Sequence, residues 1–132
     1  MKKYRSAVVP MLCTMLTLII FKTVLIIGYV PSESMEPTIH ANSFVLGLRL
    51  YGELKTGDII IFQHDGKLLV KRIAAIGGER VVHNGETVIV PKGCFYVLGD
   101  NVDNSLDSRY WTDPFVSGEE IVGRVWKDVF KL

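Results

Sequence analysis

An apolar run near the amino terminus constrains this chain more than any other feature. Residues 7–21 are apolar apart from two threonines, and after Lys22 a second apolar stretch covers residues 24–30. As a helix, the first run would be about 22 Å long, shorter than the roughly 30 Å hydrocarbon core of a bilayer. Inclusion of Ser6, or a Lys22 side chain that reaches outward, relieves this mismatch at modest cost. The run therefore predicts a membrane-attached chain.

The end of the membrane segment has two interpretations. One span through Val30 would bury Lys22, at about 2.5 to 3.5 kcal/mol for a charge in the middle of a helix. Alternatively, the span ends near Phe21, because residues 23–30 are rich in β-branched side chains and stop at Pro31, which suits a strand. We favour the shorter span.

A basic amino terminus before an apolar run also describes a cleavable secretory signal. Such a signal ends in small residues at the −1 and −3 positions of its cleavage site, whereas the stretch after this run reads FKTVLIIGYVP. An uncleaved anchor over residues 1–22 is therefore favoured, with residues 23–132 as one further domain. Lys2, Lys3 and Arg5 favour a cytoplasmic amino terminus. We thus expect a single-pass protein of the cell membrane with residues 23–132 on the extracytoplasmic face.

Composition and charge describe the rest of the chain. Of its 132 residues, 48% are hydrophobic and 22% charged, a globular composition with room for one such domain. Residues 1–22 hold four of the 15 basic residues and no acid, which leaves 11 basic and 14 acidic residues downstream. A mildly acidic domain without a basic cluster argues against nucleic acid as a partner. Cys13 lies in the apolar run and Cys94 in the polar part, so we expect two free thiols.

Beyond Pro31 the sequence shows short β-rich runs between turn signals and no helical period. The predicted strands are residues 43–48, 58–62, 67–76, 80–82, 87–90, 94–98 and 121–126. Asn84-Gly85 predicts a hairpin, because a type I′ turn needs positive φ at both central residues. The expected fold class is mainly β, a small antiparallel domain behind one amino-terminal transmembrane helix. Residues 99–118 break the pattern as a polar loop, and loops of that length are usually functional.

Two short segments carry candidate catalytic groups. In PSESMEPT, residues 31–38, two prolines restrict the chain and hold the hydroxyls of Ser32 and Ser34 on a stiff turn, although an ordinary polar turn has the same composition. In the strand LLVKRIA, alternation sends Lys71 and Arg72 to opposite faces. If Lys71 faces inward, burial lowers the pKa of its amine, and a neutral amine can act as a base. An edge-strand lysine that discourages aggregation is the alternative.

The polar loop GDNVDNSLDSRYW alternates Asp and Asn, as calcium-binding loops do. An EF-hand loop needs Gly at its sixth position and Glu at its twelfth, but counting from Asp100 those positions hold Ser105 and Trp111. We therefore expect no metal site and no cofactor. A loop organised by its own hydrogen bonds is favoured, with Asp107 and Arg109 available as an ion pair.

The three segments together, in this order behind a membrane anchor, resemble the bacterial type I signal peptidases, in their small single-anchor Gram-positive-like form. PSESMEPT is similar to the nucleophile box of that family, VKRIAAIGGE to its lysine box, and GDNVDNSLDSRYW to its loop signature. Weaker similarity covers GDIIIF and IVGR. The resemblance implies a membrane-anchored serine endopeptidase that removes signal peptides from exported preproteins after small residues at the −1 and −3 positions. Its partners would be those signal peptides, the lipid bilayer and the secretion translocase.

The resemblance also implies roles for individual residues. Ser34 would be the nucleophile and Lys71 its general base, and the Ser32 hydroxyl would join the Ser34 backbone N–H in an oxyanion hole. Ser105 would orient the Lys71 amine. Four residues would support the loop: Asp100, Asn101, Asp107 and Arg109. Five residues would contact the substrate: Val30, Glu33, Met35, Leu69 and Val70.

Some positions depart from the family pattern, and other readings stay open. Glu33 stands where small residues are common, Asn42-Ser43 replaces a usual Gly-Asp, and Thr112 replaces a Gly. A self-cleaving repressor-type protease shares Ser-Lys chemistry but lacks the anchor and this loop. An inactive membrane-anchored scaffold would only bind export substrates. Eukaryotic-type relatives use a histidine base, for which this chain offers three candidates: His40, His64 and His83.

Overall fold

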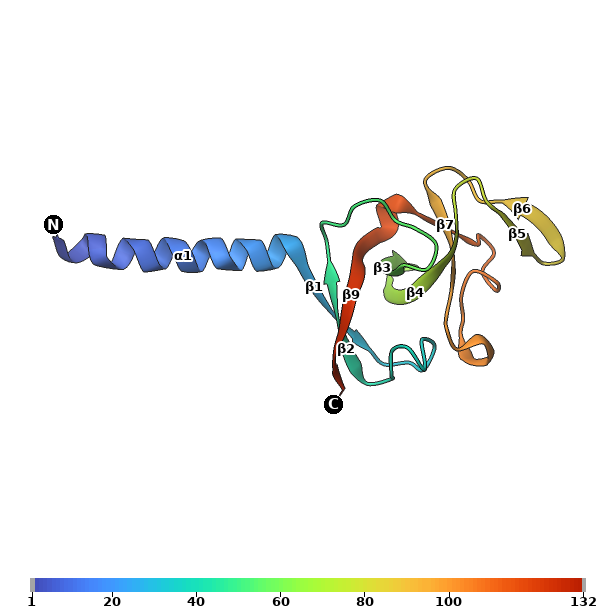
Figure 1. The fold of residues 1–132 in the computed structure, drawn as a ribbon, viewed down its shortest axis with the longest axis horizontal. Helices are drawn as coiled ribbons and strands as arrows, with labels where there is room; N and C mark the ends of the chain where they lie inside the picture. Colours follow the sequence, from blue (N-terminus) through green and yellow to red (C-terminus); the bar gives the residue numbers. More distant parts are fainter. Residues whose placement is uncertain (1, 132) are drawn as a thin grey trace.

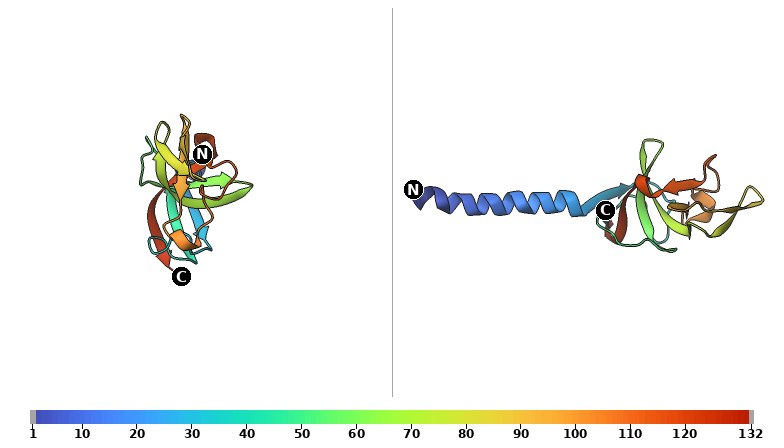
Figure 2. Two further views of the ribbon diagram at one scale, coloured as in Figure 1. Left: turned by 90° about the vertical axis from the view of Figure 1, so that its right-hand side faces the viewer. Right: turned by 90° about the horizontal axis from the view of Figure 1, so that it is seen from above.

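The structure, a computed structural model, describes the backbone of residues 2–131 and the side chains of residues 7–126. Helix α1, Lys2–Val24, projects from a β domain formed by the rest of the chain (Figure 1), and the right-hand view of Figure 2 also shows it clear of that domain. The helix ends two residues beyond the predicted boundary at residue 22. Lys22 lies in its last turn. Ala7–Val24 has a mean hydropathy of 2.0, is long enough to cross a membrane, and is not buried by the protein.

Strands form most of the domain within residues 2–131. They are β1 Leu25–Val30, β2 Ser43–Leu48, β3 Ile59–His64, β4 Lys67–Ile76, β5 Arg80–His83, β6 Glu86–Ile89, β7 Cys94–Leu98, β8 Phe115–Ser117 and β9 Ile121–Lys131. Seven of them form one antiparallel sheet in the order β1-β2-β9-β3-β4-β7-β8, and β5 and β6 form a separate hairpin. The fold class predicted from the sequence is confirmed.

Two strands depart most from the sequence prediction, while the bounds of β3, β5 and β6 differ from it by one or two residues. Strand β8 lies inside the predicted loop of residues 99–118, because three residues are too few for alternation to be recognised; Val116 is nevertheless buried where β8 pairs with β7. Strand β9 continues past residue 126, because its first part pairs with β3 and its later part pairs with β2. In the β5–β6 hairpin, Asn84 and Gly85 have φ of 51° and 82°, which agrees with the predicted type I′ turn.

A cluster of buried side chains fixes the segment that follows β1. Its members come from β1, β2, β3 and the turn between β1 and β2: Val30, Met35, Ile39, Val45 and Ile61. Met35 is fully buried, which stabilises the turn by about 1.5–3 kcal/mol relative to an exposed side chain. Because Met35 follows Ser34 directly, this burial also holds Ser34 in place. The expected contact between Met35 and substrate is therefore not what the structure shows; Met35 packs in the core.

Strand β4 has a second partner along only part of its length. Residues 72–76 pair with β7, while residues 67–71 pair with β3 alone. The other edge of residues 67–71 has no strand partner within the described part of the chain. This open edge lies next to the end of β1, so backbone groups of β4 remain available to an extended peptide at that point.

Candidate active site

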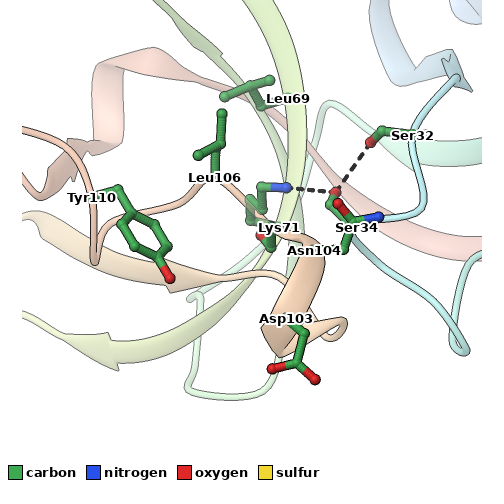
Figure 3. Close-up of a pocket in the computed structure, with 9 residues that line it drawn as sticks. Ser32, Ser34, Leu69, Lys71, Asp103, Asn104, Leu106 and Tyr110 are labelled. Carbon is green, nitrogen blue, oxygen red and sulfur yellow. Dashed lines mark hydrogen bonds between the residues drawn. The ribbon is translucent and has the colours of Figure 1, made fainter.

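Ser34 and Lys71 meet at the centre of the site. Ser34 lies in the turn after β1 and Lys71 lies in β4, and Lys71 Nζ and Ser34 Oγ are hydrogen-bonded at 2.6 Å (Figure 3). Only 7% of Ser34 and 4% of Lys71 are exposed. The neighbouring Ile73, two residues along β4, is buried on the same face. A hydroxyl and an amine held this close can exchange a proton.

Burial lowers the pKa of the Lys71 amine below that of a free lysine. The carboxylate of Asp107 partly opposes this shift, and the guanidinium of Arg109 adds to it. Within the described residues, Ser34 is the single hydrogen-bond partner of the amine, so few groups stabilise its charged form. Because the shift favours the neutral amine, Lys71 is suited to accept the proton of Ser34.

The Ser32 hydroxyl lies on the other side of Ser34. Its Oγ is 3.2 Å from Ser34 Oγ, and Figure 3 shows Ser32 and Lys71 on opposite sides of that atom. Unlike Ser34, Ser32 is exposed. A donor in this position can bind negative charge that develops next to Ser34.

A buried carboxylate organises the loop that covers the site. Asp107 is 0% exposed. It accepts hydrogen bonds from Nε and Nη2 of Arg109, at 2.8 and 2.9 Å. It also accepts from the Gly99 amide at 2.9 Å and from the Ser105 hydroxyl at 2.8 Å. Burial alone would raise the pKa of Asp107, but these donors together hold it below its usual value. The hydroxyl of Ser105 thus donates to Asp107, and no hydrogen bond joins Ser105 to Lys71 in the described residues.

The loop also directly contacts the turn that carries Ser34. The Asn101 amide donates to the carbonyl of Ser34 at 3.0 Å. Gly99 is required here, because a Cβ at this position would overlap Ser105 and the Ser34 carbonyl. The side-chain amide of Asn101 donates to the backbone oxygen of Glu33 at 3.1 Å. The side-chain amide of Asn104 donates to the carboxylate of Glu33, also at 3.1 Å. Glu33, expected to contact substrate, instead joins the turn to the loop.

Arg72 lies near the site, and sequence reasoning assigned it no role. Its guanidinium donates two hydrogen bonds to Asp100, at 2.8 and 2.6 Å, and one to the Gly57 carbonyl at 2.7 Å. The hydrogen bonds from Arg72 are the main reason that the pKa of Asp100 is lowered. This pair joins β4 to the start of the loop, one residue from Lys71. Alternation did place Arg72 opposite Lys71. Its partner Asp100, however, is 28 residues away in the sequence, so no local pattern indicated that the two residues pair.

Two pockets adjoin Ser34 and share four lining residues: Ser32, Ser34, Leu69 and Lys71. The first, which we call the loop pocket, has a volume of about 420 Å³ and continues along Asp103, Asn104, Ser105, Leu106 and Tyr110. The second, the strand pocket, has about 250 Å³ and continues along Tyr29, Val30, Pro31, Lys67, Leu68 and Val70. Of the residues expected to contact substrate, Val30, Leu69 and Val70 line the strand pocket, whereas Glu33 and Met35 line neither pocket.

The three histidines lie away from these pockets. His40 is 3.8 Å from the carboxylate of Glu36, His64 stacks on Trp111 with ring centroids 4.0 Å apart, and His83 belongs to β5. None of them lines either pocket beside Ser34. The geometry favours Lys71 over a histidine as the partner of Ser34.

Comparisons with known proteins show which family this chain resembles. A family model described as signal peptidase, peptidase S26, matches residues 1–90 and 82–129. Signal peptidase I of Leptolyngbya laminosa is 30% identical over 73% of this chain and 64% of that protein. Probable signal peptidase I-2 of a Synechocystis strain is 30% identical over 74% of this chain and 60% of that protein.

A plant relative extends the same comparison. The mitochondrial ATP-independent inner membrane protease subunit 1b of Arabidopsis thaliana is 29% identical over 75% of this chain and 69% of its own length. The chain spans less than two thirds of the length of the two cyanobacterial relatives. The family model covers nearly all of the chain, and the family resemblance of the three motifs is thereby confirmed. This chain belongs to the signal peptidase family, peptidase S26.

Proposed function

We propose that this chain is a membrane-anchored serine endopeptidase that removes signal peptides from exported preproteins. The observation that carries the proposal is the 2.6 Å contact between Lys71 Nζ and Ser34 Oγ, buried at the point where two pockets meet. Family membership supports the substrate class. The site also supplies every group that acyl transfer requires.

In the proposed reaction, neutral Lys71 takes the proton of Ser34 as Oγ attacks the scissile carbonyl carbon. The oxyanion that forms is bound by the Ser34 backbone N–H and the Ser32 hydroxyl. When the C–N bond breaks, the Lys71 ammonium gives its proton to the leaving amine, and an acyl-Ser34 ester remains. Water, deprotonated by Lys71, then hydrolyses this ester and restores both side chains.

The strand pocket supports the preference for small residues at the −1 and −3 positions. It is the smaller of the two pockets, and most of its lining is apolar, including Val30, Leu69 and Val70. An extended peptide could pair with the open edge of residues 67–71, and side chains at alternate positions of that peptide would point toward the same wall. Backbone pairing would supply affinity, and limited pocket volume would select small side chains.

Helix α1 supports the proposed membrane anchor. Strand β1 begins at Leu25, directly after the helix, and carries the exposed apolar side chains of Ile27, 71% exposed, and Tyr29. Such residues suit the surface of a bilayer. The side chains of Lys2, Lys3 and Arg5, on which the proposed orientation depends, lie outside the described part of the structure. A preprotein delivered by the secretion translocase would reach the site while still held in the same membrane.

The decisive experiment is incubation of the detergent-solubilised full chain with a preprotein that carries an Ala-x-Ala site. Cleavage directly after the second alanine, identified from the mass and amino-terminal sequence of the product, is expected for wild type and not for Ser34→Ala. Binding of the preprotein without cleavage by wild type would support the inactive scaffold instead. Loss of mass from the wild-type chain alone, with no cleavage of the preprotein, would support the self-cleaving protease.

The proposed topology has its own test. Protease added outside spheroplasts or protoplasts should digest the domain after Lys22, since the basic amino terminus favours a cytoplasmic location. Protection until the cells are lysed would reverse the orientation.

A further inference from the structure

The loop pocket and the strand pocket carry different charges. Lys71 lines both of them. Among the remaining described residues of each lining, the loop pocket has one charged side chain, Asp103, and the strand pocket has one, Lys67. The two halves of the cleft therefore present opposite charges to a peptide that lies across Ser34.

The position of Lys71 indicates which half receives the leaving chain. The leaving amine must take its proton from the lysine that removed the proton of Ser34, so it departs past Nζ. Figure 3 shows the Lys71 amine on the side of Ser34 that faces Leu106 and Tyr110, with Ser32 on the opposite side. Both Leu106 and Tyr110 belong to the loop pocket. The leaving chain is therefore directed into the loop pocket.

The membrane helix indicates the same direction. Helix α1 leads directly into β1, whose last residues line the strand pocket. The segment of residues 102–110, orange in Figure 1, lies farther from α1 than β1 does. The apolar part of a signal peptide precedes its cleavage site and remains in the bilayer. Hence the signal-peptide half lies over the strand pocket, and the mature half lies over the loop pocket.

Asp103 is available to contact that mature half. Its side chain is exposed, and no hydrogen bond or ion pair engages it within the described residues. Asp103 and Tyr110 both line the loop pocket, and in Figure 3 the Asp103 carboxylate points away from Ser34 and Lys71. Arg109 lies over the Tyr110 ring at 5.3 Å, but its guanidinium is already bonded to Asp107 and to the Val102 carbonyl. Asp103 thus places a negative charge, without a hydrogen-bond or ion-pair partner among the described residues, at the wall of the loop pocket.

We propose, as an extension of the proposed function, that the loop pocket binds the first residues of the released mature chain and that Asp103 selects a basic over an acidic side chain there. Arginine or lysine would pair with the carboxylate, whereas glutamate or aspartate would be repelled by it. The effect is electrostatic and exposed to solvent, so it decreases as ionic strength rises.

The test uses peptides that share one signal-side sequence and differ by Lys, Gln or Glu at each of the first three mature positions. At low ionic strength, and for at least one of the three positions, wild type should cleave the Lys peptide with a kcat/KM about 3- to 10-fold above that of the Glu peptide. Asp103→Asn should abolish this order, and Asp103→Lys should reverse it. Glu86→Gln, the same change of acid to amide in the β5–β6 hairpin, should retain it.

The outcomes separate this inference from the function on which it rests. Cleavage of the Gln peptide by wild type tests the function, and no cleavage would overturn both. Cleavage with equal kcat/KM for Lys and Glu at all three positions would overturn the inference alone. A Lys-over-Glu order that persists in Asp103→Asn would also overturn it, because the selection would then belong to another group.

Discussion

Lys71 and Asp107 are both buried and ionisable, yet the protein treats them in opposite ways. Within the described residues Lys71 has one hydrogen-bond partner, Ser34, and the pKa of its amine is lowered, which favours the neutral form. Asp107 accepts hydrogen bonds from Arg109, Gly99 and Ser105, and its pKa is lowered, which favours the charged form. Burial penalises the charge in both cases. The number of hydrogen-bond partners that can stabilise each charge, donors for the carboxylate and acceptors for the ammonium, decides whether the charge survives.

This difference matches two different tasks. A base must be neutral before it can accept a proton, so Lys71 gains from an environment that withholds compensation. A structural carboxylate must stay charged, because protonation would leave the Arg109 guanidinium, and the backbone N–H of Gly99, without their acceptor. Removal of Lys71 should therefore affect chemistry, and removal of Asp107 should affect the fold.

The largest expected effect is on catalysis by Lys71 variants. Lys71→Met and Lys71→Arg should each lower kcat/KM by about 10⁴-fold or more, because methionine has no basic group and a guanidinium stays protonated. Thermal unfolding of Lys71→Met should occur at the wild-type temperature or above it, since a buried amine is replaced by an apolar side chain of similar length. Substantial cleavage by Lys71→Met with a normal circular dichroism spectrum would remove Lys71 from the role of base.

The next largest effect is on stability. Asp107→Ala should lower the free energy of unfolding by about 3–5 kcal/mol, because it leaves the Gly99 amide and the Ser105 hydroxyl without their acceptor and Arg109 without its ion-pair partner. Urea unfolding of both proteins at neutral pH measures this. The pKa of Asp107 is lowered in the folded state, so its contribution is present above pH 3.8, the unfolded value, and is lost as pH falls through the folded pKa. A difference between wild type and Asp107→Ala that stays constant through this acidic range would contradict the comparison.

In the proposed reaction, the Ser32 hydroxyl binds the oxyanion, a charge that is absent before the reaction begins. Ser32→Ala should reduce kcat by about 100- to 1000-fold with little change in KM, because the oxyanion forms only after substrate is bound. Steady-state kinetics on one peptide substrate measures both constants. Thr87→Ala, which removes an exposed hydroxyl from β6, should be unaffected. An increase in KM with unchanged kcat would assign Ser32 to substrate positioning.

The smallest effect concerns pH, and it distinguishes Lys71 from the histidines. Because the pKa of Lys71 is lowered from 10.5, kcat/KM should rise about tenfold per pH unit below that folded pKa and level off above it. His40→Gln, His64→Gln and His83→Gln should keep the same rising limb. Loss of the limb in any folded histidine variant would make that histidine the base and would break the contrast drawn between Lys71 and Asp107.

The sequence by itself determined the local features of this protein. A long apolar run predicts the anchor, because hydrophobicity over that length has few other uses. Alternation and turn residues predict strands 43–48, 67–76 and 94–98, whose bounds agree with β2, β4 and β7, and Asn84-Gly85 predicts the hairpin. Each of these signals arises from neighbouring residues, so no knowledge of the rest of the chain is needed.

Only the tertiary structure decided which distant groups meet. Strand β8 and the later part of β9 form because of their pairing partners, and Met35 is buried because the turn after β1 packs against β2 and β3. Arg72 binds Asp100, Glu33 binds the loop, and Ser105 donates to Asp107, although single residues carry no sign of these partners. The charge state of Lys71 also belongs here. Alternation suggests that its side chain faces inward, but desolvation and the scarcity of compensating acceptors among the described residues depend on every element packed around it.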